Sequence, residues 1–449
     1  MNAGVLLPLD LPELSFTASG SSLVRRTVLP SGVRILSEQV PGARSATIGY
    51  WVAVGSRDEQ PGTFGSTHFL EHLLFKGTKS RTALEIAVSF DSVGGEHNAM
   101  TAKEYTCYYA KIQDRDLSMA VEVIADMLTS SLIDPTEFET ERGVILEELS
   151  MADDDPGDVA NERFFEAVLG AHPLGRPIGG SAETIKAATR DAVVSHYRDN
   201  YRPQDLVITV AGAVDHDELV AGVGSALSAA GWDLAAAATP VARRQNDPDR
   251  IERGSHLTVV HRPVEQANVI VGVAGLSATD KRRSTMAVLN SILGGGMSSR
   301  LFQEIREKRG LVYSVYSFSP GYSDAGVFGM YAGCAPSKAI QVTELMMGEF
   351  RRMGSGVTDD EMRRAKGQLS GAAALALEDS DTRMSRLGRS EITLGEFMDL
   401  DESLRRLALV TQADVQELAE ELASRPVSIA AVGTVDESAF AGLAEAPVL

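Results

Sequence analysis

The chain has 449 residues, of which 44% are hydrophobic and 23% are charged, an ordinary composition for a globular protein and a length that predicts two or three domains. Its net charge of −20 argues against a nucleic-acid partner, because a phosphate backbone would be repelled, whereas basic peptides would be attracted. No segment approaches about eighteen consecutive apolar residues, so we expect no membrane-spanning helix and no membrane partner.

The first 22 residues carry Asp10 and Glu13 and lack the basic and apolar regions of a secretory signal. We expect residues 1–22 to form a flexible leader on a cytoplasmic protein. Residues 24–36 then predict a pair of strands around a Pro-Ser-Gly turn, and residues 46–54 predict a buried strand. The next predicted element is a helix that ends near Gly77.

This helix contains the sequence His68-Phe69-Leu70-Glu71-His72. Residues four apart share one face of a helix, so the two histidines can direct imidazole nitrogens at one point. Two imidazoles suit zinc, and the neighbouring Glu71, if it is not a ligand, can take a proton from the attacking water. The pattern is the inverted form of H-E-x-x-H, a zinc-peptidase signature, although two histidines could also meet by chance on an amphipathic helix. Zinc would need a third protein ligand.

Alternating elements continue after the motif. A helix is predicted over residues 83–93, and strands are predicted over residues 96–101 and 106–112. Cys107 and Cys334 are the two cysteines of the chain and lie in apolar or aromatic surroundings. We expect both to be buried thiols, since two distant cysteines do not form a disulfide framework.

Helices are expected from residue 117 to about residue 152, and the third ligand is sought on the helical stretch 134–149. Glu141 and Glu148 are seven residues apart, two helical turns, so they share a face that borders an apolar stripe. This facing mildly favours Glu148 over its neighbour Glu147, and the residue pattern alone leaves both as candidates. The competing interpretation is a solvated acidic helix.

The order of elements repeats in the second half of the chain. Strands predicted at residues 205–212 and 427–436 occupy matching places, and residues 236–250 have the composition of a linker. We therefore expect an α/β (α+β) fold of two tandem homologous domains, each a mostly antiparallel sheet packed with helices, at residues 23–235 and 251–449. The second domain lacks H-x-x-E-H at the matching position, so we expect it to have a role other than binding metal; the resemblance described below implies that it contacts substrate.

The zinc motif, followed by Glu148 76 residues after His72, resembles the pitrilysin/insulinase (inverzincin) family of zinc metallopeptidases, in its mitochondrial-processing-peptidase-like branch and as a bacterial-type single-chain member. The resemblance covers nearly the whole chain and includes residues 75–78, 94–101, 141–145, 201–203 and 299–302, with Arg306 and Tyr313. It implies one zinc ion per chain, with His68, His72 and Glu148 as ligands. It further implies Glu71 as general base and Glu141 as a carboxylate that supports a ligand.

The same resemblance implies substrate-binding residues. Asn98 and Ala99 correspond to an edge strand onto which an extended peptide adds itself through main-chain hydrogen bonds. Without the resemblance, an ordinary turn would be the preferred interpretation. Arg306 and Tyr313 correspond to donors for the substrate backbone or the developing oxyanion, although Arg306 could instead be a salt-bridged surface residue. His97 lacks helical spacing to the motif and is not expected to be a ligand.

A further acidic pair follows the predicted glutamate ligand. Asp158 and Glu162 lie ten and fourteen residues beyond Glu148, as in processing peptidases that bind a substrate arginine there. The spacing requires the helix to resume after Pro156, and a solvated acidic face is the competing interpretation. The glycines at residues 294–296 are not expected to bind phosphate, because no Gly-Lys-Ser/Thr follows them.

Together these features predict a zinc-dependent endopeptidase, processing or oligopeptide-degrading, that acts on extended peptides and prefers basic ones if the acidic pair binds substrate. The alternative is a non-catalytic scaffold or partner subunit of the same fold. The chain keeps every metal residue, which argues against this alternative. Because the zinc motif and the Arg306/Tyr313 pair occur in different copies of the repeat, we expect a homodimer with two reciprocally completed sites. A heterodimer with a related subunit is the alternative assembly.

Overall fold

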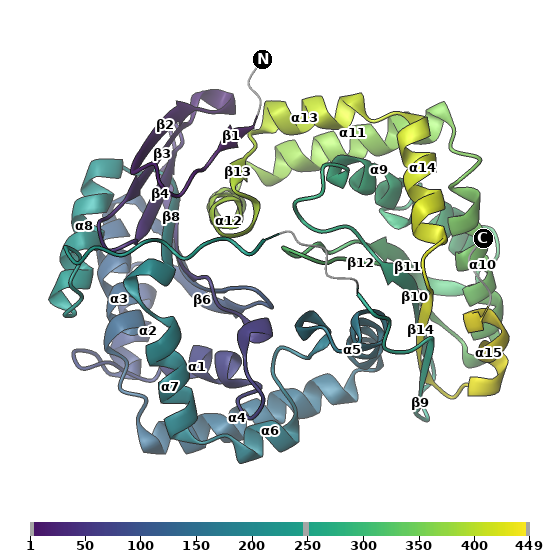
Figure 1. Ribbon diagram of the computed structural model, residues 1–449, viewed down its shortest axis with the longest axis horizontal. Helices are drawn as coiled ribbons and strands as arrows, with labels where there is room; N and C mark the ends of the chain where they lie inside the picture. Colours follow the sequence, from purple (N-terminus) through teal and green to yellow (C-terminus); the bar gives the residue numbers. More distant parts are fainter. Residues whose placement is uncertain (1–3, 246–250, 446–449) are drawn as a thin grey trace. The chain divides into compact units, whose positions relative to one another are not determined.

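The computed structural model describes residues 4–245 and 251–445 (Figure 1). The chain divides into two compact units, and each unit collects several segments. Unit 1 comprises Met1–Leu149, Pro177–Arg243 and Leu375–Glu402, and unit 2 comprises Ser150–Arg176, Arg244–Ala374 and Ser403–Leu449.

Two helices belong to the unit that is formed mainly by the other half of the chain. Helix α5 (Pro156–Leu169) packs on the sheet of unit 2, and helix α12 (Ser380–Arg389) packs on the sheet of unit 1. The observed units therefore differ in these two segments from the contiguous ranges 23–235 and 251–449. Within the predicted linker 236–250, residues 246–250 lie outside the described part, and the remainder contains no helix or strand.

A seven-stranded sheet forms the centre of unit 1 (Figure 1). Neighbouring strands are antiparallel, except for the parallel pair β4 and β8. The spatial order is β2 (Glu13–Thr17), β3 (Leu23–Val28), β4 (Arg34–Gln39), β8 (Leu206–Gly212), β5 (Ser45–Val52), β7 (Thr106–Gln113) and β6 (Glu96–Thr101). Strand β6 is thus an edge strand, and it pairs with β7 alone.

Helices cover both faces of this sheet. Successive side chains of a strand point to opposite faces, so Tyr50 packs with the helices of one face while Trp51 packs with α12 on the other. The first face carries α1 (Ser66–Leu74), α2 (Ala83–Asp91), α3 (Leu117–Ser130) and α8 (His216–Ala229). Further helices of the region are α4 (Pro135–Asp154), α6 (Ala182–Ala187) and α7 (Arg190–Asn200). The strands and helices predicted from residue 24 to residue 152 are observed close to their predicted bounds.

The N-terminal segment corrects a prediction, because residues 1–22 are not a flexible leader over their described part. Strand β1 (Val5–Leu6) pairs with β13 (Glu396–Phe397), and β2 pairs with β3 over its full length. The guanidinium of Arg26 also donates to the carbonyl oxygens of Pro8 and Leu11, at 2.6 and 2.7 Å. These contacts tie the segment to unit 1.

A buried ionic cluster joins the segment after α12 to the strands of unit 1. The carboxylate of Glu391, which is fully buried, lies 3.3 Å from Arg26, 3.6 Å from Arg34 and 3.1 Å from Arg243. Arg26 and Arg34 are themselves only 1% exposed. Three guanidinium groups therefore share one carboxylate inside the protein.

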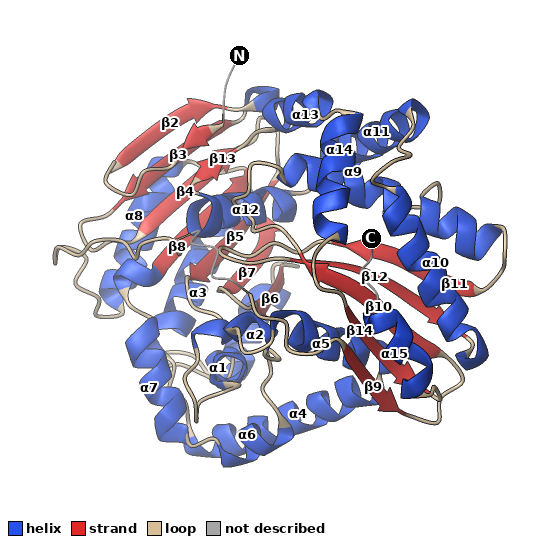
Figure 2. Ribbon diagram, turned by 45° about the vertical axis from the view of Figure 1, so that its right-hand side comes forward, coloured by secondary structure: helices blue, strands red, loops and turns tan. Residues whose placement is uncertain are grey.

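Unit 2 is built on a five-stranded sheet (Figure 2). Its order is β11 (Val312–Phe318), β12 (Val327–Cys334), β10 (Ala267–Ala274), β14 (Ser428–Gly433) and β9 (Leu257–His261). Helix α5 packs on one face, and the other face carries α9 (Arg283–Gly294), α10 (Ala339–Arg352) and α14 (Gln412–Ala423). The remaining α-helices are α11 (Asp359–Ala376), α13 (Leu400–Leu409) and α15 (Glu437–Glu445).

The two sheets share one topology, which confirms the predicted repeat and the fold class. The order β4-β8-β5-β7-β6 in unit 1 corresponds to β9-β14-β10-β12-β11 in unit 2. The single parallel pair occupies the same place in both sheets. The glycines at residues 294–296 end α9, and a side chain at Gly294 would collide with the backbone of Ser317. Close packing on β11 therefore accounts for that glycine.

Two smaller expectations can be compared with the described residues. Cys107 and Cys334 are both buried free thiols, as predicted. Within residues 4–245 and 251–445, no helix combines the length and the apolar character that crossing a bilayer requires.

Candidate metal centre

Helix α1 carries the zinc motif on one face, while its other face packs in the core of unit 1. Its first turn begins at Gly65, whose φ of +91° favours glycine. The buried carboxylate of Glu59 accepts hydrogen bonds from the backbone N–H groups of Gly65 and Thr67, at 2.8 and 2.7 Å, and so supplies the cap that Gly65 lacks. The buried face packs in the core of unit 1 through Phe69, Leu70, Leu73 and Leu74.

The opposite face of α1 brings three potential ligand atoms together. The Nε2 atoms of His68 and His72 are 3.4 Å apart. The Oε2 atom of Glu148, on α4, lies 3.8 Å from the first and 3.4 Å from the second. Helices α1 and α4 are held in this arrangement by the stacking of Phe69 on Phe138, with ring centroids 4.4 Å apart.

This triangle matches the dimensions of a zinc site. With tetrahedral bonds of about 2.0–2.1 Å, neighbouring ligand atoms lie about 3.3–3.4 Å apart, and the three observed edges are close to that value. Two imidazoles and a carboxylate are also a donor set that catalytic zinc uses. Among the residues that the structure describes, these three form the one cluster of histidines, cysteines and acids able to hold a metal ion. Glu147 is exposed and outside the cluster.

The surroundings of His68 favour the neutral imidazole that metal binding needs, and a hydrogen bond orients the ring of His72. Burial, and after it the neighbouring His72, lowers the pKa of His68. The Nδ1 atom of His72 lies 2.9 Å from Oε2 of Glu141, so an Nδ1–H donor leaves the Nε2 lone pair for a metal. Glu141 is 3% exposed, and its other oxygen lies 2.6 Å from the ammonium of Lys76. Glu141 is therefore held by a cation on one side while it orients His72 on the other.

Glu71 lies beside the cluster and contacts the edge strand. Its Oε2 atom accepts a hydrogen bond from the hydroxyl of Thr101, the last residue of β6. On the same strand, Asn98 is exposed and Ala99 is half-buried. The side-chain oxygen of Asn98 accepts the backbone N–H of Ala99 at 2.8 Å. His97 stacks on Phe90 with ring centroids 4.3 Å apart and is outside the metal cluster.

Arg306 and Tyr313 lie in unit 2 and contact each other. Arg306 belongs to a single π-helical turn, η6 (Phe302–Glu307), and its guanidinium carbon lies 5.0 Å from the centroid of the Tyr313 ring. Tyr313 is the extra residue of a β-bulge in edge strand β11 and is 77% exposed. Both a π-turn and a bulge are irregularities that re-aim side chains at functional positions.

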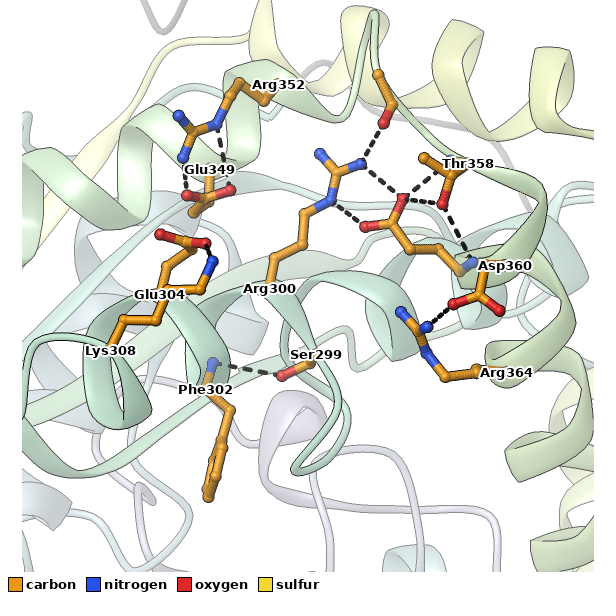
Figure 3. Close-up of polar contacts among 12 residues, drawn as sticks. Ser299, Arg300, Phe302, Glu304, Lys308, Glu349, Arg352, Thr358, Asp360 and Arg364 are labelled. Atoms are coloured by element: carbon orange, nitrogen blue, oxygen red, sulfur yellow. Dashed lines mark hydrogen bonds and ion pairs between the residues drawn. The ribbon is translucent and has the colours of Figure 1, made fainter.

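Arg300 anchors the turn that carries Arg306. Its guanidinium donates to both carboxylate oxygens of Glu361, at 2.7 and 2.9 Å, and to the carbonyl of Gly356 at 2.6 Å (Figure 3). The hydroxyl of Ser299 accepts the backbone N–H of Phe302 at 3.4 Å, which begins the π-helical turn.

Asp158 and Glu162 lie on α5, in unit 2, whereas the metal cluster belongs to unit 1. The helix resumes at Pro156, with the side chain of Asp155 accepting the N–H groups of Gly157 and Asp158. Asp158 and Glu162 are therefore one turn apart and both exposed.

Two family models match the chain, one described as Insulinase (Peptidase family M16) over residues 34–182 and one described as Peptidase M16 inactive domain over residues 187–369. The chain belongs to peptidase family M16. A Streptomyces coelicolor protein named as an uncharacterized zinc protease is 48% identical over 428 residues, which span 95% of this chain and 93% of the relative. A Bacillus subtilis protein with the same description is 37% identical over 411 residues, spanning 91% and 98%. The family inferred from the zinc motif is thus confirmed.

Solved structures agree with the M16 fold. A Helicobacter pylori protease superposes with a TM-score of 0.80 at 22% identity and spans 96% of this chain and 100% of its own. A Pseudomonas fluorescens structure described as a peptidase M16 inactive domain superposes with a TM-score of 0.81 at 18% identity, over 94% and 98% of the two chains. Both likenesses concern the fold.

No role was predicted for three residues that contribute to the candidate metal centre. Lys76 and Thr101 lie within residues 75–78 and 94–101, which carry the family resemblance, and Lys76 follows the end of α1 at Leu74. Glu59 and Thr101 reach α1 from a loop and from a strand, and no regular spacing relates them to the motif.

Proposed function

We propose that this M16 chain is a zinc-dependent endopeptidase that hydrolyses extended peptides. The observation that carries the proposal is the triangle of His68 Nε2, His72 Nε2 and Glu148 Oε2, whose edges of 3.4–3.8 Å suit one tetrahedral zinc ion. The three residues would hold that ion and leave a fourth position open. Zinc bound there would polarise a peptide carbonyl and lower the pKa of water.

The residues of the chain supply the proton transfers and the orientation. Glu71 is the general base that takes a proton from the attacking water and then gives it to the leaving amine. Glu141 accepts the Nδ1–H of His72 and fixes the ring orientation, while Lys76 compensates the charge of Glu141. These roles are consistent with their positions, since Glu71 precedes His72 on α1 and Glu141 contacts the Nδ1 atom of His72, away from its Nε2 atom.

Strand β6 is the proposed binding site for the peptide backbone. It is the edge of the seven-stranded sheet, so one side of its backbone is free to pair with an extended chain. Asn98 and Ala99 would provide this contact. The hydrogen bond from the N–H of Ala99 to the Asn98 side chain would break, and the N–H would then donate to the peptide. Main-chain pairing would make binding tolerant of substrate sequence. Arg306 and Tyr313 would donate to the substrate backbone or to the oxygen that becomes negatively charged.

Zinc removal and restoration provide the test of this function. The purified protein should contain one zinc ion per chain and cleave quenched fluorescent peptides. A chelator should abolish cleavage, and added zinc should restore it. Cleavage that survives complete zinc removal would contradict the proposal.

A non-catalytic role is the second candidate. It is favoured by the match of residues 187–369 to a model described as an inactive domain. Against it, residues 34–182 match the insulinase model, and this part contains the complete metal cluster. A zinc-loaded protein that cleaves no peptide in a diverse library would favour the scaffold role.

We further propose a homodimer, located in the cytoplasm, in which each chain completes the site of its partner. Glu71→Gln protein and Arg306→Ala/Tyr313→Phe protein should each be inactive, and mixing them should restore one site per mixed dimer. Proven subunit exchange without recovered activity would exclude completion between chains. A heterodimer with a related subunit would instead leave the isolated chain inactive.

A further inference from the structure

We propose that Thr101 is a positioning residue for Glu71, holding the base through its hydroxyl. The inference rests on the proposed function, in which Glu71 transfers the proton. The hydroxyl of Thr101 donates to Oε2 of Glu71, joining two residues thirty positions apart in sequence. In the described part of the chain, no other hydrogen bond reaches this carboxylate.

Thr101 is itself held by a clamped hairpin. It ends β6, and the turn that follows is bound to the loop before α1. The carbonyl of Ala102 accepts the N–H of Ser56 at 3.2 Å, and Arg57 forms an ion pair with Glu104 at 2.6 Å with both side chains nearly buried. The strand end that carries the hydroxyl is therefore held by a backbone hydrogen bond and a side-chain ion pair, neither of which involves the metal ligands.

This contact has two consequences for a base. A glutamate has a long side chain with several rotamers. Fixing one carboxylate oxygen orders this side chain before substrate binds, so the entropy cost of ordering it does not add to the barrier of the reaction. With Oε2 occupied by Thr101, the other oxygen of Glu71 is left to take the proton.

The contact also connects Glu71 to strand β6, the proposed binding site for the peptide backbone. Asn98 and Ala99, the proposed peptide-binding residues, belong to the strand that ends at Thr101. The spacing between the bound peptide and the base is therefore set by a short stretch of sheet backbone. A purely structural threonine at a strand end would also bond to a nearby acceptor, so the test must separate the two roles.

Replacing Thr101 by valine keeps the shape and removes the donor. We expect kcat to fall about 10- to 100-fold, less than the loss of the base itself, which is about 10²- to 10⁴-fold. KM, zinc content and the thermal midpoint should stay unchanged. Thr101→Ser keeps a hydroxyl and should recover most of the activity. Thr129 is equally half-buried and donates within α3 to Ala125, so Thr129→Val is the matched control and should retain full activity.

The Glu71→Gln background shows whether Thr101 acts through Glu71. Adding Thr101→Val there should cause no further loss of residual activity and no change in peptide binding. Unchanged kcat in Thr101→Val, equal impairment in the serine and valine variants, or a parallel loss of zinc would each overturn the inference. Absence of zinc-dependent hydrolysis in the unaltered protein would instead refute the proposed function.

Discussion

Glu391 is the centre of a buried ionic cluster, so its replacement is expected to change the stability of the fold strongly. Replacing it by glutamine keeps the size of the side chain but removes the negative charge that Arg26, Arg34 and Arg243 share at 3.1–3.6 Å. Burial already lowers the pKa of Arg34, so an uncompensated charge there is costly. Each such pair is worth about 4 kcal/mol at an effective dielectric constant of 20, and removing one partner of a buried pair typically costs about 3–5 kcal/mol. We expect a destabilisation of unit 1 in that range.

Urea denaturation combined with peptide-resolved hydrogen exchange measures this effect locally. In Glu391→Gln, the peptides covering α12 and β13 should lose protection first, because the cluster ties their segment to the sheet. Glu166 in an exposed pair with Arg163 is the control, and Glu166→Gln should cost less than about 1 kcal/mol. An unchanged midpoint together with unchanged protection of α12 would refute the charge argument.

Glu148→Ala should abolish zinc retention in a metal-content assay, whereas Glu147→Ala should retain one zinc ion, and equal losses would contradict the assignment of Glu148. Asp158→Asn with Glu162→Gln should raise KM mainly for basic peptides, an effect that added salt should weaken, and equal effects on neutral peptides would make the pair structural. Burial lowers the pKa of His196 from 6.5 to about 4, so its contribution to stability is complete above pH 6.5 and is lost at up to about 1 kcal/mol per pH unit as the pH falls toward 4. Denaturation at several pH values checks this, and a His196→Asn variant with the same pH slope would contradict it.

Local patterns predicted most elements of the fold. The Pro-Ser-Gly turn separates β3 from β4. Helix α1, which carries the zinc motif, begins directly after Gly65, whose left-handed backbone conformation favours glycine. The repeat was visible because β8 and β14 are apolar runs at matching places in the two halves. Strand β2 was not predicted, although its five residues alternate between polar and apolar as those of a half-buried strand do.

The packing of α5 and α12 in the unit formed mainly by the other half of the chain was not predictable from the order of elements along the sequence. Helix α5 follows α4 in sequence and yet packs in unit 2, while α12 packs in unit 1, and nothing in their composition assigns them to a sheet. The candidate site shows the same division. The spacing of His68 and His72 is a property of one helix, whereas the contacts of Glu71 with Thr101 and of Glu141 with Lys76 depend on how separate elements pack.

Glu71→Gln provides the most direct test of the proposed function, because it changes one oxygen to a nitrogen beside the metal cluster and leaves all three ligands in place. Zinc content and peptide cleavage should be measured on the same purified sample. We predict one zinc ion per chain and at least a 100-fold loss of kcat, in line with the contribution of about 10²- to 10⁴-fold typical of a general base. Full zinc occupancy with undiminished cleavage would contradict the role of Glu71 and with it the proposed mechanism.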